Sequence, residues 1–364
     1  MIVAVWTPLL LPLLAAPLAR LLADALSPRA AAWVLAGTSA VLAGATLCSL
    51  GLLAAAGLLL LPPVAALAHL SPHWLAGGVL GATASAALAG LAGLALTVVG
   101  TLAVRVARLR SLDLRRARAA LGDPAPAAPA RFPTARTLTA LPALLRSWAR
   151  RRRDAGEGLA VLRDLLLPGD HPLAVLEDER ADAFALPGRP GRVVVTAGML
   201  RALSAPERAA LLAHERAHLD GRHHLFLTLT AYAASVHPAL RMLRAPLGYH
   251  LERWADEAAA ASVGDRAVTA RAVGRAALAA ARAPWPARPR LVPAAHSGPV
   301  PRRVAALLHP RPQSGTRRRS AAALALAACL ALTTAATLDA TTDLHRTVES
   351  AQSAGQTSPG DPRR

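Results

Sequence analysis

Hydrophobic and polar positions divide the chain into long apolar stretches toward its two ends and a region of mixed pattern between them. A helix of roughly 20 apolar residues is long enough to cross a hydrocarbon core. Stretches of this kind occupy residues 2–22, 31–53, 75–104 and 318–338. We expect a transmembrane helix at each. The first stretch has no basic residue before its apolar run, so we interpret it as a retained anchor and not as a signal peptide.

The region between the third and fourth spans has the pattern of a linker followed by a folded domain. Residues 105–155 are basic and then rich in Pro and Ala, which favours a cytoplasmic linker. Residues 156–312 mix charged, polar and apolar positions, and about 150 residues are enough to bury a core. Residues 339–364 are polar and rich in Ser, Thr, Gln and Gly, so we expect a disordered tail.

The distribution of arginine predicts the orientation of the spans, because basic residues in short loops near span ends stay in the cytoplasm. Arg20 and Arg29 flank the first loop, and no Arg lies between the second and third spans. Arginines collect again after the third span and before the fourth. We therefore expect a multi-pass protein of the cell membrane, with the inserted domain in the cytoplasm and both termini outside.

Composition excludes several classes of protein. Forty-one basic residues against 22 acidic ones give a formal charge of +19. A nucleic-acid binder would combine such charge with stacking aromatic residues or a recognition helix, and only 3% of the residues are aromatic. Direct nucleic-acid binding is therefore not expected, whereas contact with the lipid bilayer is. Cys48 and Cys329 both lie in apolar stretches, so a metal would be held by His and carboxylate side chains.

Local patterns predict a hairpin and then a well-capped helix in the inserted domain. Residues 183–186 and 193–196 are short and apolar, and the segment between them is rich in Pro and Gly, which is typical of a β-hairpin. Ser204 is followed by a proline and then by Glu207, the spacing of a capping box. We expect a helix from there through His218.

This helix carries the sequence His-Glu-x-x-His at His214, Glu215 and His218. Two histidines four residues apart project from one helix face and can hold one Zn²⁺, with Glu215 beside the open coordination position. Zinc lowers the pKa of its water toward ~7, and a neighbouring carboxylate can take the proton and pass it to the leaving amine. The pattern predicts a zinc metalloendopeptidase, a hydrolase with one catalytic Zn²⁺.

Two patterns compete for the third metal ligand. Gly221 and His224 complete His-Glu-x-x-His-x-x-Gly-x-x-His, the metzincin pattern, in which a glycine turn returns a third His to the metal. Met242 is then a candidate for the methionine turn. Alternatively, Glu252 lies 34 residues beyond the second histidine and offers a carboxylate. Asp256 follows one helical turn later and could orient a ligand His.

These residues carry a resemblance to a known family. The zinc helix is followed by Arg222-His223 and then by Glu252-x-x-x-Asp256. Together with three spans, an inserted peptidase domain and a fourth span, this resembles the membrane antirepressor metallopeptidases of the BlaR/MecR type, which are related to the HtpX-like gluzincins. The resemblance implies an α-helical membrane protein with an inserted α+β zincin-like (gluzincin) metallopeptidase domain.

The resemblance also implies roles for individual residues. It assigns zinc ligation to His214, His218 and Glu252, general base catalysis to Glu215, and ligand orientation to Asp256. On this ground we favour Glu252 over His224 as the third ligand. His223 and His224 are then structural residues that pack beneath the site.

A peptidase also needs a donor to the developing oxyanion. His296 precedes Arg302 and Arg303, and this segment resembles the His-Pro segment followed by Arg in HtpX-like enzymes, although the proline is missing. We therefore expect His296 to be catalytic. The alternatives are Tyr249, His250 and Arg253.

The leading functional hypothesis is a membrane-embedded zinc endopeptidase that cleaves a cytoplasmic or membrane-proximal protein, for which the resemblance suggests a transcriptional repressor. The strand at residues 192–196 is expected to present an edge that binds an extended substrate. One alternative is an HtpX-like quality-control protease of membrane proteins. Another is a non-catalytic, zinc-binding membrane signalling scaffold, although such a protein has no use for Glu215.

Overall fold

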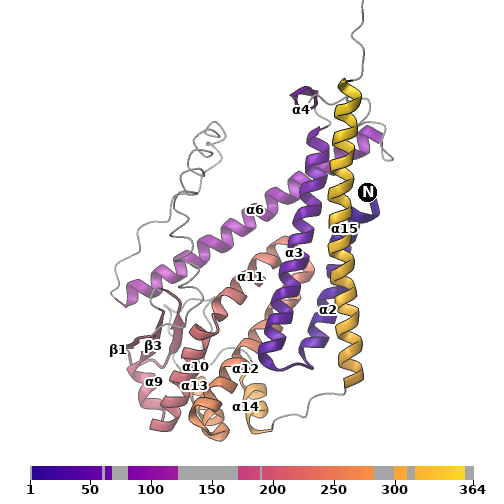
Figure 1. Ribbon diagram of the computed structural model, residues 1–364. Coiled ribbons are helices and arrows are strands. Elements are labelled where there is room, and N and C mark those ends of the chain that lie inside the picture. The colour runs from indigo at the N-terminus through magenta and orange to yellow at the C-terminus, as the bar shows by residue number, and fades with distance from the viewer. Residues whose placement is uncertain are drawn as a thin grey trace, which may run out of the picture.

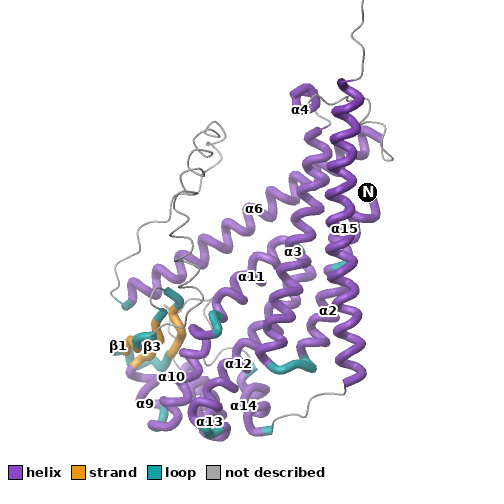
Figure 2. Tube along the Cα trace, viewed as in Figure 1, coloured by secondary structure: helices purple, strands orange, loops and turns teal. Residues whose placement is uncertain are grey.

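The computed structural model describes residues 2–59, 62–67, 81–121, 171–188, 191–282, 299–309 and 316–356. Within these residues the protein is mainly helical and has one small sheet (Figure 2). Long helices from the two ends of the chain stand side by side, and the inserted domain packs beside one end of them (Figure 1). The protein is therefore a helical membrane protein with a mixed domain attached to its bundle.

Three described helices are long and apolar enough to cross a membrane. They lie within α3 (Pro28–Leu59), α6 (Gly81–Ala120) and α15 (Thr316–Gln356). The predicted first span is instead divided into α1 (Ile2–Leu10) and α2 (Pro12–Ala23). Pro12 has no backbone N–H, so it begins a new helix and does not continue the preceding one. The four predicted spans thus correspond to three unbroken helices and one divided segment.

Two of the long helices extend past their predicted ends. The helix α6 continues from the span into the predicted linker as far as Ala120, and its Ala117 packs on Phe184 of the inserted domain. The prediction of a disordered tail is wrong for residues 339–356, which continue α15. Ala340 of this part packs with Leu52 and Leu53 of α3, so a polar composition did not prevent helix packing.

The sheet of the inserted domain has three strands in the order β1-β3-β2. The predicted hairpin is confirmed: β2 (Ala183–Leu186) and β3 (Arg192–Thr196) pair antiparallel. The strand β1 (Leu173–Leu176) pairs with β3 on its other side, in parallel. Because β3 is bonded on both sides, the expectation that it presents a free edge to substrate is wrong.

The remaining elements are helical. They are α4 (Pro62–Leu67), α9 (Ala197–Ala202), α10 (Ala205–Asp220), α11 (His223–Val236), η2 (Pro238–Leu243), α12 (Arg244–Val263), α13 (Arg266–Arg282) and α14 (Val300–Leu308).

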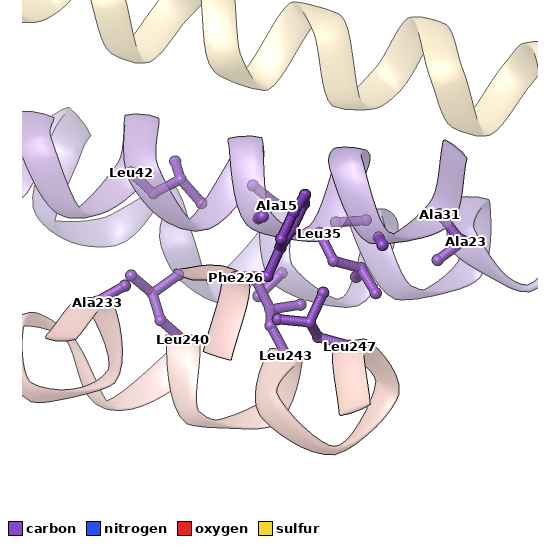
Figure 3. Close-up of a cluster of buried hydrophobic side chains, with 14 of the residues drawn as sticks. Ala15, Ala23, Ala31, Leu35, Leu42, Phe226, Ala233, Leu240, Leu243 and Leu247 are labelled. Carbon is purple, nitrogen blue, oxygen red and sulfur yellow. The ribbon is translucent and has the colours of Figure 1, made fainter. Parts of the chain in front are cut away.

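The inserted domain and the membrane helices share one apolar core (Figure 3). In it Phe226, Leu240 and Leu247 pack with Ala15 and Leu35. The inserted domain is therefore packed directly against the long helices and is not tethered at a distance.

The capping box predicted for the zinc helix is formed by a buried carboxylate. Glu207 accepts hydrogen bonds from the backbone N–H of Ser204 at 2.9 Å and from its hydroxyl at 2.8 Å, and Arg275 Nη1 lies 2.8 Å away. Burial alone raises the pKa of Glu207, but the hydrogen bonds from Ser204 and the charge of Arg275 lower it below its ordinary value. The start of α10 is thus held by an ionised side chain.

Glu207→Ala is expected to destabilise the folded protein by about 1 kcal/mol, because the first turn of α10 loses the Glu207 half of its capping box. The midpoint of thermal unfolding in detergent measures this effect, with Arg216→Ala on the exposed face of the same helix as the control. Since the pKa of Glu207 is depressed, its contribution is complete above the unfolded-state pKa and is lost as the pH falls through the folded-state pKa. Equal midpoints for both variants would contradict the assignment.

Candidate metal centre and active site

Three side chains from two helices converge in the interior of the inserted domain. The helix α10 supplies His214 and His218, and α12 supplies Glu252. The two Nε2 atoms lie 3.1 Å apart. Glu252 Oε2 lies 3.5 Å from His214 Nε2, and Oε1 lies 3.6 Å from His218 Nε2. All three side chains are buried, and one donor atom from each lies within 4.8 Å of the others.

The chemistry of this donor set suits a metal ion. Two imidazole nitrogens that face each other at 3.1 Å cannot both carry a proton, and a carboxylate stands beside them. These three side chains would hold a divalent cation, which would remove the need for a proton between the two nitrogens. Two histidines and one glutamate are a known ligand set of catalytic zinc, in which the fourth position stays open for water or substrate.

Asp256, one helical turn after Glu252 on α12, orients His214. Its Oδ1 lies 3.1 Å from His214 Nδ1. Burial raises the pKa of Asp256, but hydrogen bonds from Arg303 and His214 lower it to about 2. Burial lowers the pKa of His214, and the contacts with Asp256 and Glu252 raise it to about 9. With Nδ1 in contact with an ionised carboxylate, Nε2 is the nitrogen left for a metal.

His223, the first residue of α11, contacts His218. The Nδ1 atoms of His218 and His223 lie 2.6 Å apart. Burial lowers the pKa of His223 to about 3 and that of His218 well below its ordinary value, so both rings are neutral. If His218 uses Nε2 for a metal, its Nδ1–H donates and His223 Nδ1 accepts. The sequence predicted packing for His223 but not this bond.

The turn between α10 and α11 makes room for the His223 ring. A side-chain carbon at Gly221 would lie 2.4 Å from His223 Nε2, so no larger residue fits without displacing the ring. Gly221 itself has a helical φ of −76°, and the left-handed residue is Arg222, with φ 50°. The absence of a side chain at Gly221 therefore lets the His223 ring pack closely against it. The left-handed backbone conformation that separates α10 from α11 falls on the next residue, Arg222.

His223→Ala is expected to weaken zinc binding by about 10- to 100-fold, the usual effect of removing a partner that orients a ligand. His223→Gln keeps an acceptor and is expected to lose less. A competition titration with a chromophoric chelator measures both dissociation constants. Wild-type affinity in the Ala variant would show that His223 only fills space.

The general-base candidate lies next to these ligands. Glu215 is completely buried on α10, and its charge helps to raise the pKa of Arg303 after burial has lowered it. This places the carboxylate within electrostatic reach of the metal centre.

The other predicted candidates lie elsewhere. His224 is half-buried and is not among the three converging donors; burial and the charges of Arg110 and Arg222 lower its pKa to about 4. Met242 is 42% exposed. His296 lies outside the described residues.

The alternative oxyanion donors contact other side chains. Tyr249 faces the Arg302 guanidinium, with 4.7 Å between its ring centroid and Cζ. His250 Nε2 is 4.0 Å from Asp24 Oδ1. Arg253 is paired with Glu257 at 2.7 Å.

Two histidines and a carboxylate that converge beside a helical glutamate define the site of a metallopeptidase. The model of peptidase family M48 matches residues 148–249, less than a third of the chain. This stretch contains His214, Glu215 and His218 and ends just before Glu252. M48 peptidases depend on zinc, and the match together with the site identifies the protein as a zinc metallopeptidase, a hydrolase. No solved structure matches the chain.

Proposed function

We propose that this protein is a membrane-embedded zinc endopeptidase that cleaves a cytoplasmic or membrane-proximal protein. The observation that carries the proposal is the convergence of His214, His218 and Glu252 on one point, with Glu215 beside them on the same helix as the histidines. The match to peptidase family M48 over the segment with both histidines supports the same class.

Each side chain at the site has a separate role in the proposed hydrolysis. His214, His218 and Glu252 would hold the ion, which when bound would supply an activated water and polarise the scissile carbonyl. Glu215 takes the proton of the attacking water and returns it to the leaving amine. Asp256 and His223 keep the two imidazoles in the tautomers that direct Nε2 to the ion.

The position of the site favours a substrate close to the bilayer. Trp33 of α3 makes an edge contact with Phe226 of α11, with ring centroids 4.8 Å apart. Arg29, at the start of α3, stands 5.3 Å over the ring of Trp254 on α12. The turn before α3, the basic end of α6 and the start of α15 all lie toward the inserted domain (Figure 1). By the rule for basic residues, we assign this side to the cytoplasm.

The long helix α6 favours a regulated peptidase over a housekeeping one. It runs without interruption from a membrane span to the sheet, where Ala117 packs with Phe184 and Val194. Arg110 Nη1 on the same helix donates to the carbonyl of His224 at 3.3 Å. A movement of this span therefore acts directly on the domain, as expected of a BlaR/MecR-type enzyme whose substrate is a regulatory repressor.

Zinc analysis and cleavage assays of the detergent-purified protein test the proposal. We expect about one zinc per chain, hydrolysis of casein, loss of hydrolysis after chelation and its return on addition of zinc. Bound zinc without any cleavage would favour the signalling scaffold. Mapping new protein N-termini in cells with and without Glu215→Gln separates the remaining alternatives, since a repressor-cleaving enzyme yields few and a quality-control protease yields many.

A further inference from the structure

We infer that Arg303 positions Glu252 and Asp256 and thereby joins α14 to the candidate metal centre. The inference rests on the proposed zinc site and adds to it a residue from an element that carries no ligand. Arg303 is a positioning residue, because it contacts the proposed ligand and the residue that orients His214.

The guanidinium group of Arg303 is completely buried and bridges the two carboxylates. Its Nε and Nη2 donate to the two oxygens of Asp256 at 2.9 and 2.6 Å, a bidentate pair. Its third nitrogen, Nη1, lies 3.0 Å from Glu252 Oε2. Each nitrogen of the guanidinium group thus faces a carboxylate oxygen in the protein interior. These contacts restrict the side chains of Glu252 and Asp256.

The charges at the site explain why an arginine stands there. Glu252 and Asp256 are four residues apart on one helix, so two like charges share one face. Glu215 adds a third buried carboxylate from α10. With the three carboxylates ionised and His214 neutral, as it would be as a metal ligand, Arg303 leaves two negative charges, which a divalent cation would neutralise. The arginine therefore reduces the repulsion between the carboxylates before and after the ion binds.

The ion pair with Arg303 also restricts how Glu252 faces the histidines. Arg303 Nη1 lies beside Oε2, which is 3.5 Å from His214 Nε2, and Oε1 is 3.6 Å from His218 Nε2. At the same time, the bidentate pair keeps Asp256 Oδ1 against His214 Nδ1. One side chain thus aligns two of the three proposed ligands, one directly and one through Asp256.

The helix that carries Arg303 is close in sequence to the long helix α15. The helix α14 packs on α12 and α13 through Val304 and Leu307, which contact Ala260 and Val273. Seven residues separate α14 from α15. A displacement of α14 would withdraw Arg303 from both carboxylates together, so the metal site depends on the element that precedes α15 in the chain.

The test compares Arg303→Lys and Arg303→Met with Arg302→Met, an exposed arginine on the same helix. The readouts are the zinc dissociation constant, the absorption spectrum of the cobalt-substituted protein and the melting temperature of the metal-free protein. We expect zinc affinity to fall about 10- to 100-fold in Arg303→Met, with a changed cobalt spectrum. Arg303→Lys keeps the charge but cannot form the bidentate fork, so it should recover only part of the affinity. Arg302→Met should match the wild type.

The lysine variant decides the outcome even if the methionine variant does not fold. Wild-type zinc affinity and an unchanged cobalt spectrum in folded Arg303→Lys, with only the melting temperature lowered, would overturn the inference and leave the proposed function intact. Failure of the wild type itself to bind zinc or cobalt would overturn both.

Discussion

Glu215→Gln is expected to lose peptide-bond hydrolysis while it keeps its zinc. Glutamine preserves the size of the side chain but cannot take a proton from water, and removal of a general base typically costs on the order of 10²- to 10⁴-fold in rate. Zinc should stay bound, because the donor atoms belong to His214, His218 and Glu252. Elemental analysis and casein cleavage on the same preparation measure both properties.

The matched control for this experiment is Glu257→Gln. Glu257 pairs with Arg253 and Arg266 on the far side of α12, so the same chemical change occurs outside the site. The control should cleave casein at close to the wild-type rate. A Glu215→Gln protein as active as this control would remove Glu215 from the mechanism.

Glu252→Ala is expected to lose zinc under conditions in which the wild type stays saturated. Structural zinc sites bind with about 10–16 kcal/mol shared among four ligands, so loss of one ligand should weaken binding on the order of 10²- to 10³-fold. The buried histidines, left without a facing carboxylate, cannot replace it. Chelator competition followed by elemental analysis gives the two dissociation constants.

His224→Ala distinguishes the two ligand assignments in the same assay. Its side chain is not among the converging donors, so zinc affinity should stay within a few-fold of the wild type. The opposite pattern, in which His224→Ala loses zinc and Glu252→Ala keeps it, would support the metzincin assignment instead.

The parts of the site that the sequence predicted are those set by local geometry. The spacing of His214 and His218 on a capped helix fixes their common face, and the structure shows that helix from Ala205 to Asp220. The pairing of residues 183–186 with 192–195 follows from the Pro- and Gly-rich turn between them. Such features depend on neighbours a few residues apart, so a sequence contains the needed information.

The parts that the sequence did not predict depend on distant neighbours. Arg303 reaches Asp256 across 47 residues. The resemblance marked an arginine in this segment and the pair Glu252 and Asp256, but it did not predict that they are in contact. The strand β1 pairs with β3 and removes its free edge, although β1 has no distinctive sequence. The prediction of disorder from polar composition was also wrong for residues 339–356, because the helix there packs against α3. Only for His223, next to the zinc helix, could the short spacing to His218 have suggested the bond.

X-ray absorption at the zinc edge of the detergent-purified protein, loaded with one equivalent of zinc, tests the central claim most directly. The proposed centre predicts two imidazole ligands with the remaining positions filled by oxygen, in the wild type and in Glu215→Gln alike. Three imidazole ligands, or the absence of bound zinc, would contradict a centre built from His214, His218 and Glu252.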